Sequence, residues 1–384
     1  MSMNEAYVVT ALRTPTGKRN GGLAKVHPVD LAAHVIRELV TRTKLDPALV
    51  DDVILGCVDQ LGAQSMNIAR NAWLSAGFPE TVPGVTVERQ CASSQQALSF
   101  ASQVIRAGDA DCIVAGGVEV MSTVPMMSAL YEGEKAGAGN CWTGHGWKAR
   151  FAGEEVSQFR GAELIAERWN LSREMLEELA VSSHQRANAA WNEGRFDREV
   201  VPVAGVTRDE GIRAATTMEA LAGLKTLREG GRITAGTASQ ISDGAAALLL
   251  ASEQFVRQHR LTPIARVATC VVVGSDPIEM LTGPIPATRR ALVRRGLKLA
   301  DIGLFECNEA FASVVLAWQR TLGVDLGRVN VNGSGLSLGH PLGATGARIA
   351  TTLLHEMART RTRYGLQTMC EGAGMANATI FELA

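Results

Sequence analysis

The chain has 384 residues, enough for two to three units of ~150 residues each. It carries 38 Lys and Arg against 39 Asp and Glu, so its formal net charge is -1. Hydrophobic residues make up 46% and charged residues 20%, which predicts a large buried core and excludes a disordered chain. The balanced charge argues against a nucleic-acid partner, and no apolar run approaches the ~18 residues of a membrane span.

The cysteines indicate a reducing environment. Seven cysteines are present, and they form no C-x-x-C pair. The N-terminal residues show no basic region followed by an apolar stretch, as a secretory signal would. We therefore expect free cysteines and a cytoplasmic protein.

Strand-like and helical patterns alternate along the first third of the chain. The expected strands are 6–11, 53–58, 85–88 and 112–115. The expected helices are 29–43, 67–76 and 94–107. The strand at 112–115 is expected to end at Gly116-Gly117, with a turn over 116–122. This βαβα alternation predicts a layered α/β fold.

The last third of the chain repeats this pattern. Segments 6–11, 52–57, 85–91 and 112–117 correspond in order to 268–273, 301–307, 329–340 and 366–372. Cys91 and His340 take equivalent places in this repeat, 249 residues apart (340 − 91 = 249). We therefore expect two similar α/β halves related by a pseudo-twofold axis.

The segment between the halves differs in character. Residues 131–147 are rich in Gly and polar residues with little periodicity, whereas 172–191 have the pattern of a helix. An apolar run at 241–250 is expected to rejoin the first sheet. The predicted units are an N-terminal half of 1–120 plus 240–262, a loop domain of 121–239 inserted over the active face, and a C-terminal half of 263–384.

Cys91 is a candidate nucleophile. It lies between an expected strand and an expected helix, among polar and small residues. The partial positive charge and free N–H groups of a helix N-terminus stabilise a thiolate and lower the pKa of the thiol. A cysteine chosen at random is more often a buried apolar residue, so the context carries this hypothesis.

Three further motifs have chemical potential. His340 lies in a glycine-rich stretch directly before Pro341, which suits a first helical turn, although a packing histidine is the alternative. Cys370 can act as an acid and base, and Gly372 leaves an N–H unshielded, as an oxyanion hole requires; a buried strand cysteine before a turn is the alternative. Asn308 can hold a water or cap a helix.

Motifs for other kinds of site are missing from the sequence. No G-x-G-x-x-G follows the first strand, no G-x-x-x-x-G-K-[ST] occurs, and no H-E-x-x-H or similar ligand spacing is found. We therefore expect no dinucleotide site, no metal site and no cofactor.

Taken together, the motifs resemble those of the thiolases over essentially the whole chain. The matching residues are Cys91 with its Ser pair, Gly116-Gly117-x-Glu119-x-Met121-Ser122, Thr234-Ala235-Gly236-x-x-Ser239, Asn308-Glu309-Ala310-Phe311, Gly339-His340-Pro341 and Cys370-x-Gly372. The resemblance implies a duplicated fold with α-β-α-β-α layers and an inserted loop domain.

The resemblance also implies that a 3-ketoacyl-CoA is cleaved by CoA to acetyl-CoA, or propionyl-CoA, and a shortened acyl-CoA. Cys91 would carry the acyl group, Cys370 would act as acid and base, and His340 would keep Cys91 ionised. His340 and a water on Asn308 would stabilise the enolate oxygen. The N–H groups of Cys91 and Gly372 would stabilise the tetrahedral oxyanion.

The resemblance further places Leu227, Ala235, Ser239, Ala310 and Phe311 on the binding path of CoA. CoA and acyl-CoA would be substrates rather than cofactors. A homodimer or a homotetramer is implied.

Some positions depart from the family pattern. Gln95, Ser334 and Ala373 stand where glycine is common, and Thr237 stands where Asn is usual. Gln95-Gln96 and the stretch Thr237–Gln240 resemble the thiolases of bacterial steroid and bulky-acyl degradation, which implies a long or ring-bearing acyl group. Two alternatives remain at this point: an acetyl-CoA acetyltransferase working in the condensing direction, and a non-catalytic thiolase-like lipid-binding protein.

Overall fold

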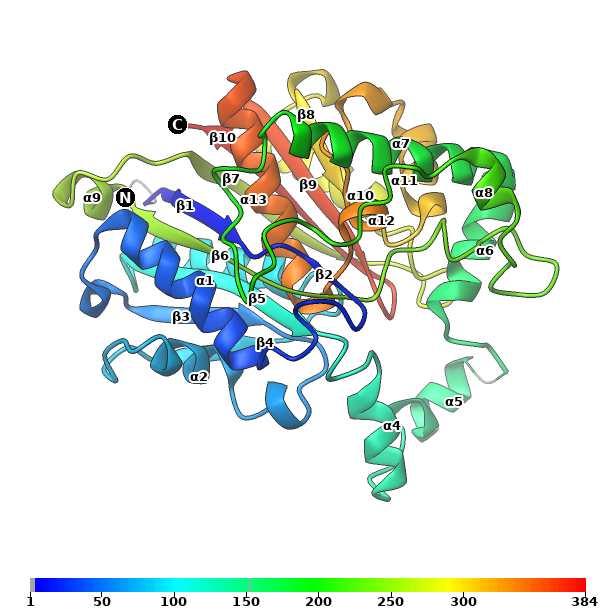
Figure 1. The fold of residues 1–384 in the computed structure, drawn as a ribbon, viewed down its shortest axis with the longest axis horizontal. Helices are drawn as coiled ribbons and strands as arrows, with labels where there is room; N and C mark the ends of the chain where they lie inside the picture. Colours follow the sequence, from blue (N-terminus) through cyan, green and yellow to red (C-terminus); the bar gives the residue numbers. More distant parts are fainter. Residues whose placement is uncertain (1–3, 152) are drawn as a thin grey trace.

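The structure is a computed structural model that describes residues 4–151 and 153–384. In these residues ten strands form one mixed sheet in the order β4-β3-β5-β6-β1-β7-β10-β9-β8, with β2 pairing beside β6 (Figure 1). The strands are β1 (Ala6–Arg13), β2 (Gly17–Lys18), β3 (Asp52–Gly56), β4 (Gly84–Val87), β5 (Cys112–Val120), β6 (Ser242–Ser252), β7 (Ala265–Gly274), β8 (Leu304–Cys307), β9 (Tyr364–Glu371) and β10 (Met375–Leu383).

The sheet consists of two halves with the same strand order. β3 runs parallel to β4 and β5, just as β8 runs parallel to β9 and to a bridge at Val329. The antiparallel pairs β5–β6 and β6–β1 match β9–β10 and β10–β7. The halves join where β1 pairs briefly with β7. The duplicated α/β fold expected from the repeat is therefore confirmed.

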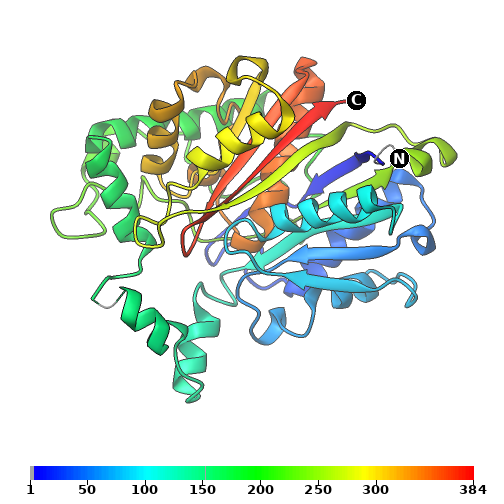
Figure 2. The same cartoon turned by 180° about the vertical axis from the view of Figure 1, so that it is seen from behind.

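Helices lie between and outside the two half-sheets. α3 (Ser93–Ala107) and α13 (Leu342–Thr360) form the central layer and contact strands of both halves (Figures 1 and 2). α1 (Pro28–Thr43) and α2 (Ile68–Ser75) cover the outer face of the first half. α10 (Pro284–Arg295) and α11 (Ala312–Leu322) cover the outer face of the second. The resulting order of layers is α-β-α-β-α, as expected.

Glycines allow the central layer to pack closely. A Cβ on Gly117 would lie 2.1 Å from the carbonyl oxygen of Gly343 in α13, and one on Gly116 would lie 2.2 Å from that of Ala246. Gly116 and Gly117 therefore lie inside β5, which continues to Val120. The expectation that the strand ends at these glycines was wrong, because they serve close backbone approach rather than a turn.

The segment between β5 and β6 contains α4 (Ser128–Lys135), α5 (His145–Phe151), α6 (Gln158–Arg168), α7 (Arg173–Asn192) and α8 (Met218–Ala222). α6 packs on α11, and α7 packs on α11 and α12 (Gly335–Leu338), whereas α4 and α5 project from the body (Figure 1). The helix expected at 172–191 is confirmed, while 131–147 contain more helix than their composition predicts. β6 takes its place in the first half-sheet, as expected.

The remaining elements are short. They are α9 (Glu253–Gln258) and the 3-10 turns η1 (Pro47–Leu49), η2 (Gly62–Gln64), η3 (Cys141–Thr143), η4 (Leu299–Asp301) and η5 (Leu326–Arg328). Among residues 4–151 and 153–384, no helix has both the length and the apolar composition needed to cross a membrane. We propose the three units 1–120 plus 240–262, 121–239 and 263–384, a division that the strand order supports.

Candidate active site

Cys91 lies directly before Ala92, the residue that caps the N-terminus of α3. Its thiol is buried and packs among apolar side chains that include Met121, Leu342 and Met369. The N–H groups of Cys91 itself and of Gly372 act on the sulfur as hydrogen-bond donors and lower the pKa of the thiol. Two backbone donors therefore already face the point where Cys91 would hold an acyl group.

Cys370, on β9, approaches Cys91 from the second half of the molecule. Burial raises the pKa of the Cys370 thiol well above its usual range, and the nearby sulfur atoms of Cys91 and Cys307 raise it further. Two adjacent buried thiols cannot both ionise easily, because like charges repel strongly in a poorly solvated site. The pair can thus hold one thiolate and one thiol, which are the two states needed for a nucleophile beside a proton donor.

His340 lies directly before Pro341, the N-cap residue of α13. The hydroxyl of Thr345 donates to the carbonyl oxygen of Pro341 at 2.8 Å, so its oxygen accepts the Nδ1–H of His340 at 2.6 Å. Nε2 then carries no proton, and Nδ2 of Asn308 lies 3.4 Å from it. This arrangement makes Nε2 of His340 a proton acceptor.

Asn308 follows β8, and its backbone N–H donates to Thr368 on β9 at 3.0 Å. Its Oδ1 is buried and has no hydrogen-bond partner within the part of the chain that the structure describes. A buried carbonyl oxygen normally has a partner. The free oxygen is consistent with the expectation that Asn308 holds a water.

Burial dominates the electrostatics of the site. It raises the pKa of Cys91 to about 12, with a further increase from the carboxylate of Glu371. It lowers the pKa of His340 to about 3, and the charge of Arg348 acts in the same direction. The neutral forms of both Cys91 and His340 are therefore favoured. Each charged form is unfavourable alone, but a thiolate beside an imidazolium would be compensated.

The five residues expected along the CoA path line one pocket of about 500 Å³ together with His340. They are Leu227, Ala235, Ser239, Ala310 and Phe311. The N–H of Ser239 donates to the carbonyl of Ala310 at 2.9 Å, which ties two of these segments together. Met121 and Leu342 also line the pocket and pack in one cluster with Cys91, so Cys91 lies behind the wall of the pocket that His340 lines.

Three cationic side chains, Lys18, Arg19 and Arg213, complete the lining of this pocket with no acidic residue among the residues that line it. All three are exposed to solvent, so they lie toward the mouth. Positive charge at a mouth attracts anionic ligands such as phosphates.

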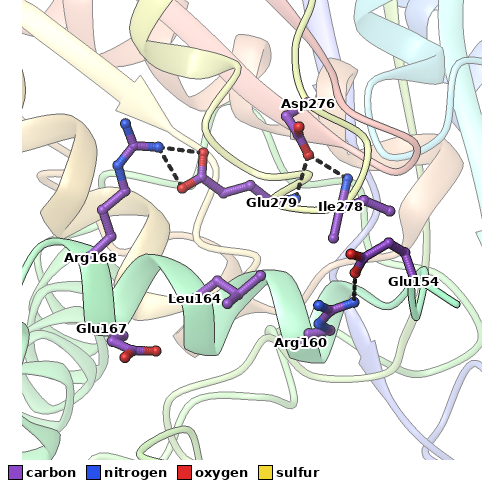
Figure 3. Close-up of a pocket in the computed structure, with 8 residues that line it drawn as sticks. All are labelled: Glu154, Arg160, Leu164, Glu167, Arg168, Asp276, Ile278 and Glu279. Atoms are coloured by element: carbon purple, nitrogen blue, oxygen red, sulfur yellow. Dashed lines mark hydrogen bonds and ion pairs between the residues drawn. The ribbon is translucent and has the colours of Figure 1, made fainter. Parts of the chain in front are cut away.

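A second hollow lies between α6 and residues 276–279 (Figure 3). Four of its charged side chains form two ion pairs: Arg168 donates to Glu279 at 2.7 and 2.9 Å, and Arg160 lies 2.7 Å from Glu154. Because these charges are already compensated across an open surface, the hollow offers no comparable arrangement of reactive groups.

The role of Thr345 was not predicted from the sequence. This residue lies in the first turn of α13, five positions after His340, and determines which ring nitrogen carries the proton. The available signal was a hydroxyl residue one helical turn beyond a histidine at a helix start. Met121 belonged to a quoted motif, but its contact with Cys91 depends on tertiary packing.

The fold and the site are those of an α/β acyltransferase. Residues 6–254 match the family model "Thiolase, N-terminal domain", and residues 261–383 match "Thiolase, C-terminal domain". The chain belongs to the thiolase family. The family assignment made from the motifs is thus confirmed, and the chain is an enzyme.

The chain is similar to several thiolases and to a solved acetyl-CoA acetyltransferase. The chain is 56% identical to the steroid 3-ketoacyl-CoA thiolase FadA6 of Mycobacterium tuberculosis, over 99% of this chain and 94% of that protein. It is 43% identical to the 3-oxoadipyl-CoA/3-oxo-5,6-dehydrosuberyl-CoA thiolase of Escherichia coli, over 99% and 100%. Among solved structures, the acetyl-CoA acetyltransferase of Bacillus anthracis superposes with a TM-score of 0.90 at 38% identity, covering 100% of this chain and 99% of that one.

Proposed function

We propose that this thiolase cleaves a 3-ketoacyl-CoA with CoA, in fatty-acid or steroid degradation, through an acyl group on Cys91. The observation that carries the proposal is the convergence of Cys91, Cys370 and the N–H of Gly372 beside a pocket that His340 lines.

The first half-reaction begins when the thiol of Cys91 passes its proton to Nε2 of His340. The thiolate attacks the 3-keto carbon, and the N–H groups of Cys91 and Gly372 stabilise the oxyanion, each contributing about 3 kcal/mol. The C2–C3 bond then breaks and its electron pair remains on C2 of the CoA-bearing fragment. The enolate oxygen is stabilised by the protonated Nε2 of His340 and by a water on Asn308. Cys370 gives its proton to C2, which releases acetyl-CoA.

The second half-reaction transfers the acyl group to CoA. The Cys370 thiolate left by the first step takes the proton from the thiol of a new CoA molecule. The CoA sulfur attacks the acyl carbon, the bond to Cys91 breaks, and Cys91 leaves as a thiolate beside protonated His340. Splitting the reaction into two acyl transfers explains why one nucleophile and one shared acid and base suffice.

We further propose a long or ring-bearing acyl group as the substrate. The 56% identity to a steroid 3-ketoacyl-CoA thiolase supports this, and so do the apolar side chains in the pocket lining, which include the flexible Met121 and Met126 beside Phe159 and Leu342. Comparison of kcat/KM across linear and ring-bearing 3-ketoacyl-CoA substrates tests it. A preference for short linear chains would contradict it, and a faster condensation of acetyl-CoA would favour the acetyltransferase alternative.

We also propose that the enzyme works in the cytoplasm as a homodimer or homotetramer, with CoA as a substrate and no metal or other cofactor. Free cysteines support the cytoplasmic setting. Helices α4 and α5, which contribute no buried residue, offer a surface for a second subunit. Light scattering of the purified protein measures the subunit number.

Two cysteine variants test the roles of the sulfur atoms. Cys91→Ser should abolish turnover and the acyl adduct that mass spectrometry detects on the peptide carrying Cys91. Cys370→Ala should still accept an acyl group from an activated thioester but should not cleave the C–C bond. The exposed Cys141, replaced by Ala, is the matched control and should leave both steps unchanged. Near-normal turnover of Cys91→Ser would reject the proposal.

A further inference from the structure

Glu371 is a buried carboxyl group that the mechanism above does not use. It is the last residue of β9, directly after Cys370, and it is fully buried. Side chains two positions apart on a strand lie on the same face, so Glu371 shares the face of Met369, which packs against Cys91. The carboxyl group therefore faces the loop that carries the nucleophile.

The carboxyl group of Glu371 has no hydrogen-bond partner. Neither of its oxygen atoms is bonded to any group in the part of the chain that the structure describes. The nearby cation is Arg89, whose Nε is also buried without a partner, and whose NH1 lies 3.9 Å from the sulfur of Met375. A buried carboxylate without hydrogen bonds is strongly unfavourable, so this environment favours the neutral acid.

Few other groups can change this balance. Arg89 favours the carboxylate, while Glu88, exposed on the same loop as Arg89, opposes it. The backbone N–H of Asn377 on β10 also favours the carboxylate, although it forms no hydrogen bond of normal geometry with it. Cys91 and Cys370 are the adjacent thiols. Burial outweighs the favourable contacts and raises the pKa of Glu371 to about 8. At pH 7 the acid form therefore predominates.

The charge of Glu371 matters because of its position beside Cys91. After burial, the Glu371 carboxylate has the largest effect among those that raise the pKa of Cys91. We propose that Glu371 is a positioning residue for the thiolase reaction: its neutral acid allows Cys91 to ionise, whereas its carboxylate opposes the thiolate. This inference rests on the proposed role of Cys91 as the nucleophile.

The test measures the ionisation of Cys91 rather than turnover. The full-length enzyme and its Glu371→Gln variant are treated with iodoacetamide between pH 6.5 and 9.5, and mass spectrometry follows alkylation of the peptide carrying Cys91. Glutamine has the size of glutamic acid and stays neutral. We expect rates within twofold of each other at pH 6.5 and a variant about fivefold faster at pH 9, where the wild-type residue carries its charge. Equal rates at pH 9 would overturn the proposal.

Two further variants separate this role from general charge or packing effects. Glu88→Gln removes an exposed carboxylate of the same loop and should change the rate less than twofold; an increase as large as that of Glu371→Gln would overturn the proposal. Arg89→Gln should keep Glu371 neutral to higher pH, so alkylation at pH 9 should exceed that of the wild type about two- to fivefold. A direct effect of a lost cation would slow the reaction instead, and such a slowing would also overturn the proposal.

The Arg89 variant provides the test if Glu371→Gln does not fold. The failure of this inference is also distinguishable from failure of the proposed function. Alkylation reports the thiolate of Cys91 whether or not the enzyme turns over, whereas the loss of turnover in Cys91→Ser reports its role in the reaction.

Discussion

Replacement of Thr345 by Val should slow the acylation of Cys91 through a change in His340. The Thr345 oxygen accepts the Nδ1–H of His340 at 2.6 Å and fixes the neutral imidazole with a free Nε2. Valine has nearly the same shape but no hydroxyl group, so the buried Nδ1–H loses this partner. The imidazole can then carry its proton on Nε2 instead, and Nε2 can no longer accept the proton of Cys91.

The size of the effect follows from the hydrogen bonds that remain. The carbonyl of Pro341 keeps its bonds from the N–H groups of Ala344 and residue 345, both at 2.9 Å, so it adds no cost. One buried donor is left unpaired, at a cost of about 1–3 kcal/mol. If this cost falls on the tautomer that accepts the proton, the acylation rate falls about 5- to 150-fold.

Rapid-quench single turnover with an acyl-CoA, read out as acyl adduct on the Cys91 peptide, measures this rate. Thr345→Ser keeps the hydroxyl and is the matched control, with a rate expected within about threefold of wild type. KM should change little, because Thr345 does not appear among the residues that line the pocket. A folded Thr345→Val enzyme that acylates as fast as Thr345→Ser would refute the tautomer argument.

Three other predictions test the packing and the electrostatics. Burial lowers the pKa of His340 from the usual 6.5 to about 3, so the folded protein binds this proton less readily than the unfolded chain and loses stability as pH falls from 6.5 toward 3. In His340→Gln, the loss of unfolding free energy between pH 7 and pH 5, measured by urea unfolding, should be about 1–2 kcal/mol smaller than in wild type. Gly346→Ala would place a Cβ 2.3 Å from the backbone nitrogen of Gln95 and should lower the unfolding free energy by about 3 kcal/mol. In the control Gly274→Ala the new Cβ meets no atom within 4 Å, so the loss should be less than about 1 kcal/mol. Equal losses would contradict the close packing of α3 on α13. Ala373 has a φ of 60°, a left-handed conformation that glycine adopts with less strain than alanine. Ala373→Gly should therefore increase the unfolding free energy by about 0.5–1 kcal/mol and raise the midpoint of thermal unfolding. An unchanged or lower midpoint would show that this conformation is not strained.

The sequence was most informative where local pattern and repeat agree. The helices after Cys91 and His340 begin at Ser93 and Leu342, and these starts differ by the same 249 residues as the two side chains (342 − 93 = 249). An alternation of strands and helices depends on local composition, so the layered fold could be predicted. The two halves could be recognised because each carries the same order of elements.

Features that depend on contacts between distant residues could not be predicted in this way. Gly116-Gly117 has the composition of a turn, but the neighbouring backbones of Ala246 and Gly343 leave no room for a side chain there, and the strand continues. Glutamate is usually a surface residue, but Glu371 is buried at the end of β9. At Gly116 and Gly117 the deciding contacts come from segments more than 100 residues away.

The duplication explains how one site obtains unlike reactive groups. Each half presents a helix start at an equivalent place, and the first carries Cys91 where the second carries His340. The strands that follow these helices have diverged further: β9 brings Cys370 close to Cys91, whereas the corresponding β5 brings Gly117 against α13. A thiol side chain at Gly117 would collide with Gly343 in α13, so β5 could not carry a second cysteine there without loosening the central layer. The asymmetry of the chemistry and the close packing of the two halves are therefore parts of the same arrangement.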